Sequence, residues 1–297
     1  MSPVAGGATV PPWALAVGAM VSVQLSSALS MPLIEEAGPA GTAWLRLSLG
    51  AVVFLAIGGA RLRGIRRADL PVLFALGATT GLMTVAFLAA IERIPLGTTV
   101  AIEFLGPLTV AAVRSSSRRT LAWPALALAG VVVLTQPWHG EVNAPGVAFA
   151  VLAAVGWGGY ILLTQRVGDR YAGVTGLAVT IPVAAVATAV VGLPQAAPHL
   201  TVDALAWAAL LALLMPVLPM ALEMLALRRM THTAFGTLMA LEPGFGALLG
   251  FAILDQALSP AQVAGISLVV IAGAAAQLGG RREDAPALSP AAEVSVG

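Results

Sequence analysis

The sequence contains no cysteine and no lysine, and it has few charged residues of either sign. The absence of cysteine excludes disulfides, iron–sulfur clusters and thiolate zinc sites. Of the 297 residues, 10% are charged and 59% are hydrophobic, whereas soluble domains have about 25% and 45–50%. Too few polar side chains remain to cover a water-soluble surface, so the composition predicts an all-α integral membrane protein.

Histidine is also scarce, and the net charge is +1. His139, His199 and His232 fall in separate predicted loops without a paired spacing, so we expect no metal site and no cofactor. A nearly neutral chain offers no field that would attract nucleic acid. The predicted spans contain no Asp and no His, and their serines have no neighbouring base, so we do not expect an enzyme.

The hydrophobic residues form long continuous runs of the length that crosses a bilayer as a helix. Residues 1–12 contain no basic residue, so we interpret the first run as a retained helix and not as a secretory signal. We predict ten transmembrane helices, over residues 13–34, 42–60, 70–91, 96–113, 120–136, 145–164, 172–192, 204–227, 233–254 and 260–279.

Arginine placement predicts the orientation of these spans, because cytoplasmic loops retain basic residues. Arg93 lies alone in the loops of one side, and Arg46 lies inside the second span. The other thirteen arginines fall on the opposite side, which we assign to the cytoplasm together with both termini: Arg61, Arg63, Arg66, Arg67, Arg114, Arg118, Arg119, Arg166, Arg170, Arg228, Arg229, Arg281 and Arg282. Residues 280–297, rich in Ala, Pro and Ser, are expected to form a disordered cytoplasmic tail.

The two halves of the chain resemble each other at an offset of 136 residues. Residues 86–108 align with 222–244, which places Pro107 on Pro243 and Arg93 on Arg229. We therefore predict two five-helix repeats, 13–137 and 145–279. Five is an odd number, so the second repeat enters the bilayer from the other side, an inverted arrangement that is typical of secondary transporters with a site near the midplane.

Four charged residues lie inside the predicted spans, where each costs about 2.5–3.5 kcal/mol on insertion scales. Glu103 and Glu242 lie near the middle of the fourth and ninth spans. Glu223 and Arg46 lie about one turn from a span end, from which we expect them to reach the interface. The depth of Glu103 and Glu242 therefore makes them the first candidates for a functional site.

Each central glutamate is accompanied by a proline that interrupts the helix. Pro107 has no N–H for the carbonyl of Glu103, and Pro243 has none for the carbonyl of Met239. Residues 103 and 239 are equivalent under the repeat, and lipid would not tolerate the free acceptors. We expect both helices to be broken and the acceptors to face a cavity or another helix.

Several roles remain open for these residues. Glu103 and Glu242 are candidates to bind a substrate amine or a coupling proton, or they are protonated and hydrogen-bonded as packing contacts. Arg46 is a candidate for a substrate carboxylate or for a salt bridge with Glu35 or Glu36, and Glu223 for a pair with Arg228. Weaker binding candidates are Gln24, Thr99, Tyr160 and Gln165, with Gln24 and Tyr160 equivalent under the repeat.

Proline and glycine mark further sites of bending and close approach. Pro216 and Pro219 predict a kink in the eighth span that could act in gating. Glycine pairs at GxxxG spacing, Gly77 with Gly81 and Gly246 with Gly250, predict close helix packing within the monomer.

Several segments are similar to the EamA family of the drug/metabolite transporter superfamily, and in particular to its inner-membrane threonine and homoserine exporters. The resemblance covers nearly the whole chain through IPLGTTVAIEFLGPLTVA (94–111), GWGGYILLTQRVG (156–168), LPMALEMLALRRM (218–230), FGTLMALEP (235–243), RLSLG (46–50) and LSPAQ (258–262). It implies a ten-helix fold, proton-coupled export of small metabolites, and functional positions at Arg46, Glu103, Gly106, Pro107, Tyr160, Gln165, Glu223, Gly236 and Glu242. Asp255–Gln256 departs from the glycine–glutamate pair that is usual in the family.

We therefore predict an exporter of small amino acids in the cytoplasmic membrane of a bacterium, with the amino acid, protons and lipid as its partners. The oligomeric state is left open. Export of cationic drugs is an alternative, although 5% aromatic residues make a multi-aromatic cage hard to build. A non-transporting membrane scaffold is a further alternative, but it leaves the central glutamates unexplained.

Overall fold

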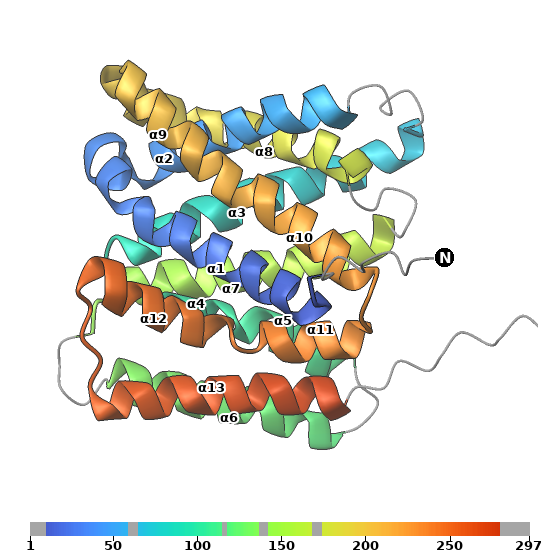
Figure 1. The fold of residues 1–297 in the computed structure, drawn as a ribbon, viewed down its shortest axis with the longest axis vertical. Coiled ribbons are helices and arrows are strands. Elements are labelled where there is room, and N and C mark those ends of the chain that lie inside the picture. Colours follow the sequence, from blue (N-terminus) through green and yellow to red (C-terminus); the bar gives the residue numbers. More distant parts are fainter. Residues whose placement is uncertain (1–9, 59–64, 115–117, 137–141, 168–173, 280–297) are drawn as a thin grey trace, which may run out of the picture.

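The computed structural model describes residues 10–58, 65–114, 118–136, 142–167 and 174–279, and within these ranges the chain folds into helices without a strand. The helices lie side by side, with α1 running through the middle of the arrangement (Figure 1). The helical elements of the first half are α1 (Pro12–Leu29), α2 (Met31–Gly58), η2 (Arg67–Asp69), α3 (Leu70–Ile91), α4 (Leu96–Glu103), α5 (Leu105–Val113), η3 (Arg118–Leu121) and α6 (Ala122–Thr135). Those of the second half are α7 (Ala144–Val167), α8 (Val174–Ala196), η6 (Ala197–His199), α9 (Val202–Ala212), η7 (Leu213–Val217), α10 (Leu218–Leu227), α11 (His232–Met239), α12 (Glu242–Leu254) and α13 (Pro260–Gly279).

The helices have the length and composition of membrane spans. Eight helical segments of the described residues are long and apolar enough to cross a bilayer, and two further apolar segments, Ala122–Thr135 and Pro260–Ala276, are shorter. An all-helical membrane protein is therefore confirmed. The tail 280–297 lies outside the described residues, as do His139, Arg61, Arg63, Arg170, Arg281 and Arg282.

The boundary between the first two predicted spans was wrong. The first span was expected to reach residue 34, but α1 ends at Leu29 and α2 begins at Met31. Gly38, with φ 70°, bends α2 just before Pro39, so a short helical segment precedes the long one. The apolar run continues across the junction of α1 and α2 to Ile34, which is why hydropathy alone placed the boundary incorrectly. His232 was expected in a loop and instead begins α11.

The fourth and ninth spans are both broken at the expected positions. Helix α4 ends at Glu103 and helix α11 ends at Met239, the residues whose carbonyls Pro107 and Pro243 leave without a helical partner. Adding 136 to the bounds of α4 reproduces the bounds of α11. The prediction of broken helices is confirmed, and both breaks lie at equivalent positions of the two halves.

The eighth span is also irregular where two prolines were noted. Helices α9 and α10 are joined by η7, a π-helical segment in which Met215 has non-helical dihedral angles and which contains Pro216. Pro219 lies in the first turn of α10. Ser22 Oγ of α1 donates to the carbonyl oxygen of Leu214 at 2.6 Å. The expected kink is confirmed, and α1 supplies a donor to one of its carbonyls.

Small residues allow the helices to approach closely. The Cβ that a side chain would add at Gly106 lies 2.1 Å from the carbonyl oxygen of Ala154, so α5 and α7 are in backbone contact there. Gly77 and Gly81 lie against α8, and Gly246 lies against Val100 of α4. The glycine pairs thus pack within the monomer as predicted, and they hold the broken helices close to their neighbours.

Candidate functional site

Two buried polar side chains from the two halves of the chain meet in the interior. Gln24 of α1 donates through Nε2 to Oε1 of Glu242, the first residue of α12, at 3.3 Å. Their relative exposures are 1% and 6%. Among the described residues, Gln24 Oε1 and Glu242 Oε2 have no hydrogen-bond partner. Buried polar atoms are nearly always paired, so these two acceptor oxygens indicate a place for a hydrogen-bond donor.

Glu103 reaches the same region from the other broken helix. It is the last residue of α4, it is half-buried although it lies deep in its span, and it interacts electrostatically with Glu242. The next residue, Phe104, packs edge-on against Trp157 of α7 with ring centroids 6.0 Å apart. The two helix breaks therefore place their central glutamates close enough to interact electrostatically.

Glu223 and Tyr160 extend this group toward α10 and α7. Glu223 interacts electrostatically with Glu242 and with Tyr160, and Tyr160 is hydrogen-bonded to Thr164. Both Glu223 and Tyr160 are half-buried. The structure thus brings together five residues that the sequence singled out, from five different helices.

We call Glu103, Glu223 and Glu242 the acid cluster. Within the described residues no arginine forms an ion pair with any of them, including Arg228, the expected partner of Glu223. Nor do three His, Cys, Asp or Glu side chains of the described chain converge as metal ligands. The acid cluster therefore has the chemistry to accept an organic cation or protons.

Arg46 lies elsewhere and is more deeply buried than expected. Its exposure is 4%, and its Nε and Nη1 atoms have no hydrogen-bond partner in the protein. The prediction that Arg46 reaches the interface was wrong, because α2 continues from Arg46 back to Met31 and encloses it within the fold. The described residues show no ion pair between Arg46 and Glu35 or Glu36.

Gln165 and Thr99 do not join the acid cluster. Gln165 is exposed near the end of α7, where its Oε1 accepts from Arg114 Nη1. A pocket of about 310 Å³ lies there, lined by Arg114, Leu162, Gln165 and Arg166. Thr99 is buried but donates to the carbonyl oxygen of Pro95 in its own helix at 3.2 Å. The hydroxyl of Thr99 is thus already satisfied.

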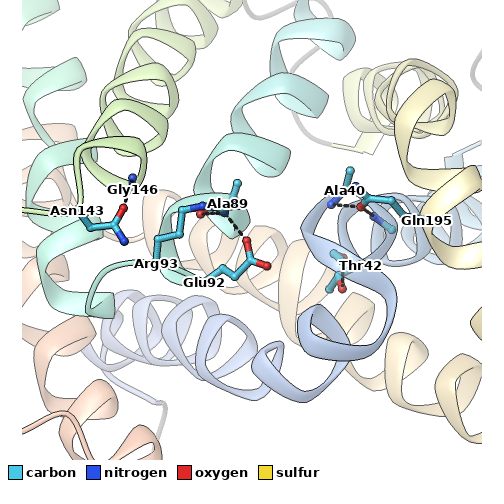
Figure 2. A network of polar contacts seen from close by, with 10 residues as sticks. Ala40, Thr42, Ala89, Glu92, Arg93, Asn143, Gly146 and Gln195 are labelled. Carbon is cyan, nitrogen blue, oxygen red and sulfur yellow. Dashed lines mark hydrogen bonds and ion pairs between the residues drawn. The ribbon is translucent and has the colours of Figure 1, made fainter.

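Glutamine side chains at the helix ends were not anticipated. Gln195 Oε1 accepts from the backbone N–H groups of Ala40 and Gly41, each at 3.1 Å, at the bend of α2 (Figure 2). Gln256 Oε1 similarly accepts from the N–H of Leu96, the first residue of α4, at 2.9 Å. A single sequence carries no signal for such contacts, which join residues 154 to 160 positions apart. They give Gln256, at the position that departs from the family, a role in joining α12 to α4.

Arg93, the single arginine in the loops of the predicted non-cytoplasmic side, contacts nearby residues. It pairs with Glu92 and donates to the carbonyl oxygen of Ala89 at 2.6 Å (Figure 2). It also lies 5.1 Å from the ring centroid of Phe149. In the same view the Asn143 side chain accepts from the N–H of Gly146 at the start of α7. These contacts hold the loop that joins α3 to α4.

Comparison with known proteins agrees with this architecture. Residues 144–275 match the model of the EamA-like transporter family. The threonine/homoserine exporters RhtA of Escherichia coli K12 and Salmonella typhimurium LT2 are each 35% identical over 271 residues, which covers 89% of this chain and 90% of each relative. A solved crystal structure with 20% identity superposes with a TM-score of 0.55 over 89% of this chain and 98% of the other, and it supports the fold alone.

Proposed function

The chain belongs to the EamA-like transporter family, and from this premise we propose that it exports small amino acids such as threonine and homoserine. The similar transporters named above carry these cargoes. Export would proceed across the bacterial cytoplasmic membrane, driven by protons that enter in the opposite direction. The arginine-rich side, with both termini, would face the cytoplasm.

The observation that carries this proposal is the acid cluster with its unpaired acceptors. Gln24 Oε1 and Glu242 Oε2 need donors, and an ammonium group supplies three. Glu103 and Glu223 add further carboxyl groups around the same place. A protonated amine and a coupling proton would compete for these oxygens, so binding of one would release the other.

Alternating access would follow from two inverted repeats, 13–137 and 145–279. Contacts between the two halves have counterparts in which the equivalent helices are exchanged. The contact of α3 with α7 corresponds to that of α10 with α1, and the contact of α5 with α7 corresponds to that of α12 with α1. This pattern supports ten spans arranged about a pseudo-two-fold axis. Such transporters expose a central site by rocking one repeat against the other.

One pair of contacts is unequal between the halves. Helix α4 packs extensively on α12, where Gly246 lies against Val100, whereas α5 and α11 make no comparable contact in the described part of the chain. Under the 136-residue offset, Gly246 corresponds to Val110 and Val100 corresponds to Gly236. The second contact would therefore join the same two residue types, with glycine and valine exchanged between the helices. We therefore assign the structure to a state closed at the α4–α12 side and propose that the α5–α11 contact forms in the opposite state.

The test is counterflow of radiolabelled threonine in proteoliposomes, with and without an imposed pH gradient. Wild type is expected to exchange threonine and to respond to the gradient. Glu103→Gln and Glu242→Gln should reduce exchange or its pH response, while Glu92→Gln, which alters an exposed glutamate outside the acid cluster, should behave as wild type. Absence of threonine and homoserine exchange in wild type would reject this cargo.

The acid cluster also supports a second candidate, export of a lipophilic cation. Phe104, Trp157 and Tyr160 lie beside it, and aromatic rings attract organic cations. Ethidium efflux from the same vesicles separates the two candidates. Efflux of ethidium without threonine exchange would favour the cation.

A further inference from the structure

Arg46 is a buried cation that nothing in the described protein neutralises. Only 4% of the residue is exposed, and Nε and Nη1 lack hydrogen-bond partners. A charge buried without a partner is strongly destabilising. Guanidinium stays protonated in proteins, so the cost is not relieved by loss of a proton. A buried arginine without a partner indicates that an anion binds to it during the transport cycle.

The position of Arg46 on α2 directs it into the protein. Ala43 and Gly50 share its face of the helix, one turn before and one turn after it. Ala43 belongs to a buried cluster with residues of α1 and α3, and the Cβ position of Gly50 lies 3.2 Å from the ring of Pro216 in η7. The exposed residues Val52 and Leu55 lie on the opposite face. Arg46 therefore lies where α2 adjoins α1, α3 and the irregular segment η7.

Helix α1 connects this place to the acid cluster. Gln24 of α1 bonds to Glu242, while Ser22 and Ser26 of the same helix donate to the carbonyl oxygens of Leu214 in η7 and Leu211 in α9. The interior thus has a cationic group on α2, which adjoins η7, and an acidic group at Glu242, and α1 is bonded both to η7 and to Glu242. A zwitterion has the two charges that complement this arrangement.

We propose that Arg46 binds the carboxylate of the transported molecule and thereby selects amino acids over simple amines. The inference rests on the proposed export function. A planar guanidinium with free N–H groups matches a carboxylate through charge-assisted hydrogen bonds better than an ammonium does. The acid cluster would take the amino group, so a cargo that lacks either charge would leave one buried group unpaired.

The experiment compares threonine with threoninol and threonine amide, which retain the amine and lack the carboxylate. In counterflow, unlabelled threonine should compete with the labelled cargo in wild type, and the two analogues should not. Arg46→Gln should weaken competition by threonine about tenfold or more and should lose the preference for threonine over its amide. Arg46→Lys, which keeps the charge, should retain part of the preference, and Arg93→Gln should leave it unchanged.

A binding measurement separates failure of this inference from failure of the proposed function. The thermal unfolding midpoint of the purified protein in detergent is measured with threonine, threoninol and threonine amide. A rise with threonine alone in wild type, absent in Arg46→Gln, supports carboxylate binding even if vesicles show no exchange. Wild-type preference for threonine that persists in both Arg46 variants would overturn the role of Arg46 and leave the export function intact. No exchange and no rise with threonine in wild type would overturn both.

If Arg46→Gln does not fold, Arg46→Lys carries the test. Loss of threonine affinity in a folded Arg46→Lys protein supports the inference, because lysine cannot reproduce the planar geometry of guanidinium. Undiminished affinity and undiminished selectivity in that variant contradict the need for guanidinium.

Discussion

At the scale of single residues, the interior is unusual for its unpaired polar atoms. Gln24 Oε1, Glu242 Oε2 and two nitrogen atoms of Arg46 lack hydrogen-bond partners within the protein. In contrast, the buried hydroxyls of Thr80, Thr84 and Thr188 each donate to a carbonyl of their own helix. The unpaired atoms are therefore the ones that we propose to bind cargo or protons, whereas the paired hydroxyls make ordinary packing contacts.

The hydrogen bond between Gln24 and Glu242 can be tested by removal. Gln24→Met keeps the volume but leaves the glutamate oxygen without its donor, so we expect a loss of about 1–3 kcal/mol in stability. We also expect a higher half-saturating concentration of threonine, because Gln24 Oε1 is one of the proposed ammonium acceptors. Thermal unfolding and counterflow measure the two effects.

Ser27→Ala is the matched control for this substitution on the same helix. Ser27 Oγ donates to the carbonyl of Val23 one turn earlier within its own helix, so its removal should change stability by about 1 kcal/mol or less. Equal effects of Gln24→Met and Ser27→Ala would contradict a special role for Gln24.

At the scale of elements, the breaks in α4–α5 and α11–α12 place Glu103 and Glu242. Both breaks arise from a proline that withholds an N–H from the preceding turn. The broken helices are held by close contacts, such as that between Gly106 of α5 and the backbone of Ala154 in α7. A helix end that carries a central carboxylate is thereby kept in position within the membrane.

Gly106→Ala should disrupt this arrangement. The added Cβ would lie 2.1 Å from a backbone oxygen, and overpacking costs typically about 1–3 kcal/mol. We expect a lower unfolding temperature in detergent and reduced threonine exchange. Gly244→Ala in α12 is the control, because its Cβ would meet nothing within 4 Å and should be neutral or slightly stabilising. A stable, active Gly106→Ala protein would show that α5 and α7 can separate at no cost.

At the scale of the whole molecule, the two halves match in their helices but not in all their contacts. The 136-residue offset relates α4 to α11 and α5 to α12. The α4–α12 contact is extensive, and its counterpart between α5 and α11 is not. This inequality is the arrangement that the proposed alternation between the two contacts would produce.

Cysteine cross-linking tests this alternation in a chain that has no cysteine of its own. The pair Val100→Cys and Gly246→Cys should cross-link readily in the state described here. The equivalent pair Val110→Cys and Gly236→Cys should cross-link little in that state, because Val110 lies against Gly158 of α7. Trapping the second pair should lower cross-linking of the first when all four cysteines are present.

Cross-linking yields would be measured by gel mobility after mild oxidation, with each single cysteine variant as the control. Simultaneous, complete cross-linking of both pairs in an active transporter would argue against alternation between the two contacts.

The sequence alone determined the membrane class, most helix positions and the breaks at Glu103 and Met239. It could do so because hydropathy and the missing N–H of proline act locally along the chain. Only the tertiary structure decided that Gln24 meets Glu242 across 218 positions, that Gln165 remains apart from the acid cluster, and that Arg46 is enclosed. These outcomes depend on which helices pack together and on the bend at Gly38, and such long-range contacts leave no pattern in a single sequence.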